Sequence, residues 1–181
     1  MPGLNLVAEM KRTHRDKDWP YVTALGARML AAGDALGWLH IYDENLLRDF
    51  NKTGKHAAAL CRRRPVLELA ADHDPRLRAA LRAEIEYWHE LDRVRMRIYE
   101  QAVRPYLVAV RKSRLRPDAA LSDQHNLRVR CAEKWLPTNP VHDYGITRMI
   151  SEAREAVAQI IQPAALAWLP EVREHFTLLA G

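Results

Sequence analysis

One long apolar stripe constrains the fold more than any other feature of this sequence. After the segment His73-Asp74-Pro75, apolar residues recur at every third or fourth position: Leu77, Leu81, Ile85, Trp88, Leu91, Val94, Ile98 and Ala102. Side chains with this spacing share one face of an α-helix. We therefore predict a helix from Asp74 to about Arg111, kinked or ended near Pro105, whose stripe must be covered by other helices.

The rest of the chain also shows helical spacing, without the strict alternation of a β-strand. Leu4, Val7, Ala8 and Met10 indicate a first helix. Asp18-Trp19-Pro20 is typical of a helix start, so we predict that Asp18 caps a second helix, with Pro20 in its first turn. Gly33 should end that helix.

Further helices are expected from Asp34 or Asp43 to Phe50, from Ser122 or Asp123 to Trp135, and from Gly145 to Gln162, with a short apolar segment after Pro65. The predicted fold is all-α, an irregular helical bundle around the one long helix, with the first two helices packed against it. A chain of 181 residues fits a single domain, and a subdomain junction is expected near residues 113–121.

Cysteine usage and charge placement predict a cytoplasmic protein. Cys61 and Cys131 show neither a disulfide framework nor a zinc pattern, so we expect reduced, buried thiols. Charged residues interrupt the first thirty positions, as they would not in a signal peptide, and no uncharged run is long enough to span a membrane.

The cations are 22 Arg against 6 Lys, and the formal net charge is +5. Guanidinium groups suit phosphate or carboxylate recognition, which makes an Arg-rich nucleic-acid-binding protein one alternative. However, 23 acidic residues are interspersed with the cations. The arginines then have a simpler interpretation, in which they coat helices and pair with neighbouring Glu and Asp.

A row of polar residues borders the stripe of the long helix: Arg82, Glu86, His89 and Arg93. Intervals of three and four favour a ladder of ion pairs within the helix. Arg82 and His89 also have a spacing compatible with a HEPN-like ribonuclease, in which Arg stabilises the scissile phosphate and His acts as acid or base. Glu86-Tyr-Trp-His89 matches the Glu-x-x-His unit of di-iron bundles, but no second copy follows, so we predict no metal and no cofactor.

The N-terminal residues Leu6, Val7, Lys11, Thr13, Arg15, Asp16, Lys17, Asp18, Trp19 and Pro20 form a recognisable pattern. This segment resembles the one that follows the catalytic sheet in a family of bacterial nucleotidyltransferase-like proteins, and a fainter similarity reaches about residue 104. The resemblance implies that Lys11, Arg15 and Lys17 face a nucleotide, the catalytic lobe or another partner.

The groups that nucleotidyl transfer requires are not found in this sequence. That reaction uses a Gly-Ser turn for the triphosphate and an Asp-x-Asp pair for magnesium. Asp16-Lys17-Asp18 has the spacing, but it stands between helices with no strand before it. We therefore expect a truncated reading frame, or a helical half that has become a non-catalytic binding or partner module. Apolar surface left by a missing lobe would favour self-association or a protein partner, and a nucleic acid or nucleotide is the alternative ligand.

Overall fold

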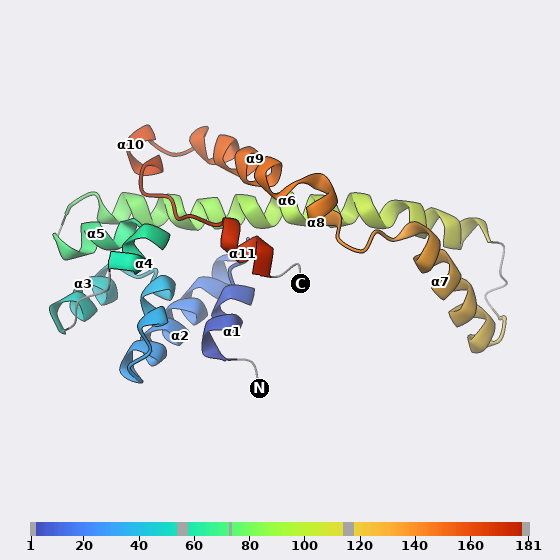
Figure 1. The fold of residues 1–181 in the computed structure, drawn as a ribbon, viewed down its shortest axis with the longest axis horizontal. Helices are drawn as coiled ribbons and strands as arrows, with labels where there is room; N and C mark the ends of the chain where they lie inside the picture. The colour runs from blue at the N-terminus through green and yellow to red at the C-terminus, as the bar shows by residue number, and fades with distance from the viewer. Residues whose placement is uncertain (1–2, 54–57, 73, 114–117, 179–181) are drawn as a thin grey trace.

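One helix runs along the whole molecule and carries most of the others. The computed structural model describes residues 3–53, 58–72, 74–113 and 118–178. Within these ranges every regular element is helical, which confirms the all-α prediction. The long helix α6 spans Leu77–Lys112, close to the predicted bounds, and it continues past Pro105 instead of ending there (Figure 1).

The N-terminal half contains the predicted helices with small shifts at their ends. Its elements are α1 (Leu4–Met10), the 3₁₀ turn η1 (Asp16–Asp18), α2 (Trp19–Ala31), the 3₁₀ helix η2 (Ala35–His40), α3 (Glu44–Thr53), α4 (Ala58–Arg63) and α5 (Val66–Ala71). Asp34 and Asp43 each accept a hydrogen bond from a backbone amide at the start of a helix. The two residues predicted as alternative starts of one helix therefore begin two separate helices, η2 and α3. The helix after Asp43 extends three residues beyond the predicted end at Phe50.

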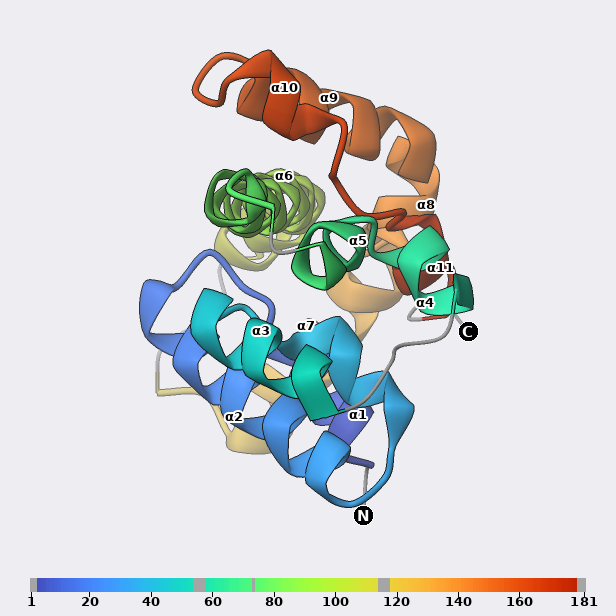
Figure 2. The same cartoon turned by 90° about the vertical axis from the view of Figure 1, so that its left-hand side faces the viewer.

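The C-terminal half contains α7 (Leu121–Trp135), α8 (Pro140–Tyr144), α9 (Ile146–Ala158), α10 (Pro163–Leu166) and α11 (Arg173–Leu178). Within it, α9 and α10 return along the side of α6 opposite α1 to α3, whereas α11 lies on the same side as α1 (Figure 1). Seen end-on, α6 lies between α9 and α10 on one side and α1 to α3 on the other (Figure 2). The helix predicted to reach Gln162 ends at Ala158, and neither Ser122 nor Asp123 caps α7, because that helix already begins at Leu121.

Two apolar clusters share α6 as a common wall. The larger one surrounds Tyr87, Trp88 and Leu91 and includes side chains from α1, α2, α9 and α11. The smaller one surrounds Leu77 and Leu81 and is built with η2, α3, α4 and α5. The first two helices therefore pack against α6, as predicted. Cys61 and Cys131 are free thiols, but both are half-buried, which corrects the expectation that they are buried.

Two glycines allow α2 and η2 to pack closely. A Cβ atom on Gly26 would lie 2.9 Å from the carbonyl oxygen of Gly37, and one on Gly37 would lie 2.5 Å from the carbonyl oxygen of Gly26. Gly33 ends α2 with a φ of 80°, as its position in the sequence predicted. The amide of Asp34 then donates to the carbonyl of Met29, which completes the helix terminus.

The far half of α6 and all of α7 project away from the rest of the molecule (Figure 1). We call this part the arm: residues 96–112 of α6, the helix α7, and the connection 136–139. No described residue of α7 is buried. The predicted junction near 113–121 falls between the two helices of the arm, although residues 114–117 lie outside the described part of the chain.

Candidate functional site

In the charged segment between α1 and α2, some side chains pair with Asp18 and others point toward α6. Lys11, Arg15 and Lys17, predicted to face a phosphate or a partner, are all exposed. Two of them converge on one carboxylate: Arg15 Nη2 lies 2.6 Å from Asp18 Oδ2, and Lys11 Nζ lies 3.9 Å from Asp18 Oδ1. Their charges therefore already have a partner within the chain.

Asp18 is buried and acts as the centre of this group rather than as a helix cap. Burial alone would raise the pKa of Asp18, but hydrogen bonds from Thr13 and Arg15 and the nearby cations lower it overall. Its side chain makes no capping bond to α2, which corrects the predicted N-cap. The carboxylate instead accepts from Thr13 Oγ1 at 2.8 Å and stabilises the turn that precedes the helix.

Two other side chains of the same segment point toward α6. The backbone amide of His14 donates to Asp92 Oδ2 at 3.0 Å, and the ring Nδ1 of His14 lies 2.6 Å from the same oxygen. Arg12 extends into the interior, where its guanidinium lies over the ring of Trp88, 4.7 Å from the centroid. The segment therefore connects α1 and α2 to the long helix.

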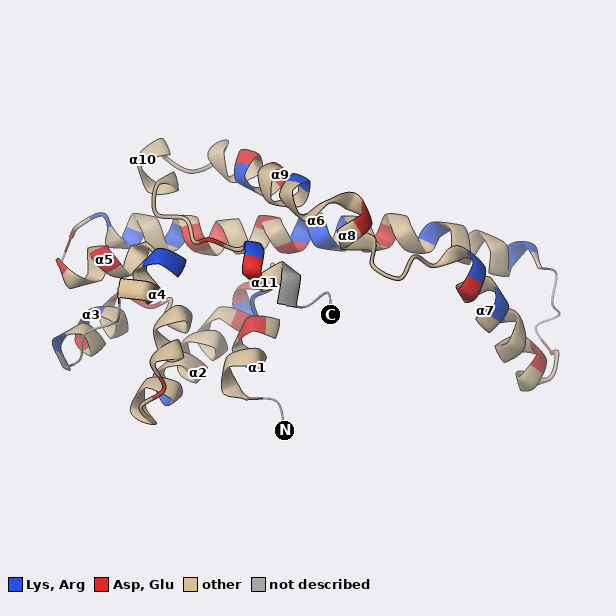
Figure 3. Cartoon of the chain, viewed as in Figure 1, with Lys and Arg blue, Asp and Glu red and all other residues tan. Residues whose placement is uncertain are grey.

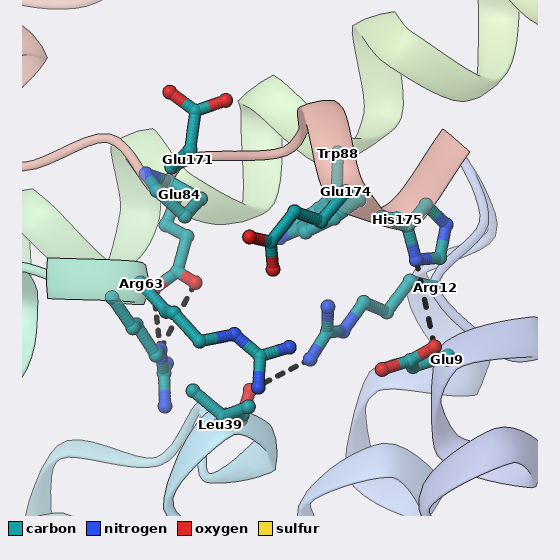
Figure 4. A pocket seen from close by; sticks show the side chains of 11 residues that line it. Glu9, Arg12, Leu39, Arg63, Glu84, Trp88, Glu171, Glu174 and His175 are labelled. Carbon is teal, nitrogen blue, oxygen red and sulfur yellow. Dashed lines mark hydrogen bonds and ion pairs between the residues drawn. The ribbon is translucent and has the colours of Figure 1, made fainter. Parts of the chain in front are cut away.

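Arg12 forms one wall of a small polar pocket (Figure 4). The pocket has a volume of about 30 Å³ and lies where five parts of the chain meet: α1 with the segment after it, η2, the junction of α4 and α5, α6, and the segment that leads into and begins α11. Its lining combines cations with carboxylates: Glu9, Arg12, Leu39, Arg63, Arg64, Glu84, Trp88, Pro170, Glu171, Glu174 and His175.

Arg64 and Glu84 form the most deeply buried ion pair of this pocket. Their side chains are 2% and 1% exposed, and Arg64 Nε lies 2.9 Å from Glu84 Oε2. Arg64 also donates to the carbonyl of Trp38 at 2.7 Å and lies over the ring of Tyr42. This one side chain thus connects η2, the α4–α5 junction and α6.

His40 is buried behind Arg12 and is held as a neutral ring. Arg12 Nη2 can only donate, so His40 Nδ1 accepts at 2.9 Å and His40 Nε2 donates to Asn5 Oδ1 at 2.8 Å. Burial, followed by the charges of Arg12 and Arg64, lowers the pKa of His40 to about 2. The sequence indicated neither His40 nor Arg64 as part of a site, because their partners are distant in the chain.

The structure does not place Arg82 and His89 together in an open groove. Arg82 is exposed on α6, whereas His89 is 4% exposed. The Nε2 atom of His89 accepts a hydrogen bond from Trp19 Nε1 at 2.7 Å. The ribonuclease alternative needs both groups at an accessible surface, and this geometry offers it no support.

Charges of both signs are interspersed along α6 and the other described helices (Figure 3). Arg95 pairs with Asp92 and Arg97 with Glu152, in keeping with arginines that coat helices. Among the described residues, no three His, Cys, Asp or Glu side chains are grouped so that they could hold a metal ion. Glu86 Oε2 lies 3.6 Å from His89 Nδ1 on the same helix.

The arm has the highest concentration of exposed apolar side chains in the described chain. Eight of the thirteen large exposed apolar residues lie within residues 96–136, and α7 contributes Leu121, which is 82% exposed. A groove of about 430 Å³ runs between α6 and the connection after α7, lined mainly by apolar atoms. The eight residues are Met96, Tyr99, Leu107, Val108, Leu121, Val129, Trp135 and Leu136.

In the described ranges, no helix is both long enough and apolar enough to cross a membrane, because α6, the one of sufficient length, is rich in charge. Comparisons of the chain with models of protein families, with curated proteins and with solved structures gave no match.

Proposed function

We propose that this chain is a non-catalytic, cytoplasmic partner-binding module, related to the helical half of nucleotidyltransferase-like proteins, and that it docks through the arm. The observation that carries the proposal is the concentration of exposed apolar residues on the arm, in which Ile98 is the one described residue that is buried. Exposed apolar side chains gathered on one part of a protein are typical of protein–protein contacts. The free thiols of Cys61 and Cys131 suit a reducing compartment.

The occupant that fits the arm best is a second copy of the chain. Both arm helices carry charges of both signs (Figure 3): Asp123, Arg128, Arg130, Glu133 and Lys134 on α7, and Arg97, Glu100, Arg104, Arg111 and Lys112 on the arm part of α6. When two identical arms lie antiparallel, Asp123 near the start of each α7 can meet Lys134 near the end of its counterpart. The apolar side chains between those ends then cover one another.

The apolar spacing on α6 continues into the arm and supports helix–helix packing. Met96, Tyr99, Val103, Leu107 and Val110 follow one another at intervals of three or four. This stripe is suited to pack against another helix, and two hairpins joined through such stripes form a four-helix bundle. Packing of this type would bury the side chains that the single chain leaves exposed.

Sedimentation equilibrium over a range of protein concentrations tests this proposal. We expect the mass to rise from 20.9 kDa toward twice that value as concentration increases. Leu107→Glu in the arm should keep the chain monomeric, because a buried unpaired carboxylate opposes association. Leu46→Glu in α3 is the matched control, since Leu46 and Leu107 are 40% and 41% exposed.

Circular dichroism should show the same helix content in both variants. A wild-type chain that stays monomeric at every concentration would overturn self-association through the arm. Equal dimerisation of both variants would place the contact elsewhere. A monomer that binds RNA, with log affinity falling steeply against log salt, would favour the nucleic-acid alternative.

A further inference from the structure

Four buried nitrogen atoms of residues that line the polar pocket have no hydrogen-bond partner among the described residues: Arg12 Nε, Arg64 Nη2, Trp88 Nε1 and His175 Nδ1. The last of them faces Glu9 Oε2 at 3.8 Å. The nitrogens of Arg12, Arg64 and Trp88 each carry a proton that can only be donated. A buried donor without a partner destabilises the folded chain. Three such donors in the wall of one pocket therefore indicate that an acceptor binds there.

Arg12 also has no described carboxylate within ion-pair distance, although its charge helps to lower the pKa of the nearby Glu9. Its guanidinium donates to the carbonyl of Leu39 at 2.8 Å and to the ring of His40, and it lies over Trp88. No described carboxylate forms an ion pair with it, although four line the pocket. Glu84 is engaged by Arg64, and Glu9 lies beside His175 at 3.8 Å. A half-buried cation without a carboxylate partner attracts an anion.

The size of the pocket limits which anion fits. A volume of about 30 Å³ holds about two water-sized atoms, since one water needs about 10–15 Å³ on this measure. The two oxygens of a carboxylate match that space. Glu171 and Glu174 also line the pocket, and Glu174 points into it in Figure 4, so a doubly charged phosphate would be repelled more strongly than a singly charged group.

We propose that the pocket binds the carboxylate group of a small molecule, with Arg12 as its counter-ion and with Arg64 and Trp88 as further donors. The bound carboxylate would accept charge-assisted hydrogen bonds from these nitrogens, so that they would no longer be unpaired. The site lies on the body of the molecule, away from the arm, and it stands whether or not the chain self-associates through that arm.

Titration of the ¹⁵N-labelled chain with sodium acetate, followed through the five tryptophan indole signals, tests the site. Trp88→Phe identifies the Trp88 signal by its disappearance. We expect the Trp88 indole signal to shift as acetate is added and to reach a plateau when the site is saturated. The Trp19 indole, already bonded to His89, should stay in place as an internal reference.

Variants assign the binding to the proposed groups. Arg12→Gln should abolish the saturable shift, whereas Arg62→Gln, at an exposed arginine outside the pocket, should leave it unchanged. Glu174→Gln should tighten acetate binding about two- to fivefold, because it removes one repelling charge from a partly solvated site. Trp88→Phe keeps the ring under Arg12 and removes only the donor, so calorimetry on this variant should show weakened binding even if Arg12→Gln fails to fold.

Two results would overturn the proposal. If no indole signal shows a saturable shift, the donors are satisfied by water alone. If inorganic phosphate binds in the same assay more tightly than acetate, the pocket is not a carboxylate site.

Discussion

Arg64 and Glu84 form an ion pair that is almost completely shielded from water, with Arg64 Nε within hydrogen-bond distance of both carboxylate oxygens, at 3.0 and 2.9 Å. They come from different parts of the chain and connect the α4–α5 junction to α6. Removing one member leaves the other charge buried without a partner, which is costly in a low-dielectric interior.

We expect Glu84→Ala to lower the free energy of unfolding by about 3–5 kcal/mol, the usual range for breaking a buried pair. The double variant Arg64→Met with Glu84→Met should be less destabilised than either single change, because neither charge then remains. Urea denaturation of Glu84→Ala, Arg64→Met, Glu84→Met and the double variant measures this. A double variant whose loss equals the sum of the single losses would show that the two side chains do not act as a pair.

Gly26 lies where no side chain fits between α2 and η2. Gly26→Ala should destabilise the chain by about 1–3 kcal/mol, because its Cβ would press on the backbone of Gly37 and on His40. Gly3→Ala is the control, since nothing lies within 4 Å of a Cβ placed there. Thermal melts of both variants test the difference, and equal melting temperatures would contradict the close packing.

Because the pKa of buried His40 is lowered, we expect the stability of the fold to decrease in acid. The pKa of His40 falls from 6.5 to about 2 on folding, so below pH 6.5 the unfolded chain takes up a proton that the folded chain does not. The contribution of His40 to stability is therefore complete above pH 6.5 and is lost as pH falls toward about 2. The slope should approach about 1.4 kcal/mol per pH unit.

His40→Gln should flatten this pH dependence, with stability read from urea midpoints between pH 7 and pH 4.5. His142→Asn, at an exposed histidine, should keep the wild-type slope. If the slope of His40→Gln matches that of wild type, the acid sensitivity has another origin.

Arg82 and His89 should differ sharply in their effect on stability. Arg82→Ala should change it by less than about 0.5 kcal/mol, as is usual for exposed positions. His89→Ala should cost about 1–3 kcal/mol, because the buried indole N–H of Trp19 loses its acceptor. Denaturation of both variants tests this expectation. A small, equal effect at both positions would reopen a surface role for His89.

Much of the fold could be read from local spacing. Three predicted features depend only on neighbours within a few residues, and all three are present in the structure. They are the apolar stripe of α6, the end of α2 at Gly33 with its positive φ, and the start of α2 at Pro20. Helix ends were less predictable. Asp18 has the residue type and position of a cap, but Thr13 and Arg15 engage its carboxylate first. Such competition is invisible to a pattern of single residues.

The polar pocket could not have been predicted, because it depends on contacts between distant segments. Arg12 and Arg64 were visible only as members of basic stretches, and nothing in the sequence placed Trp88 beneath the first of them. Residues of the same segment that looked equally suited to a ligand, such as Lys11 and Arg15, face Asp18 instead. The three-dimensional path of the backbone decides which arginine of a basic stretch has no carboxylate within ion-pair distance.

The unbroken course of α6 sets a fixed span between the two proposed sites. Trp88 and Leu107 are on the same helix, and at 1.5 Å per residue they are about 28 Å apart along its axis. A bound carboxylate therefore lies well away from the middle of the docked arm. Two chains joined along their antiparallel arms would make an elongated particle with a small-molecule site toward each extremity, and small-angle scattering would register that rod-like outline.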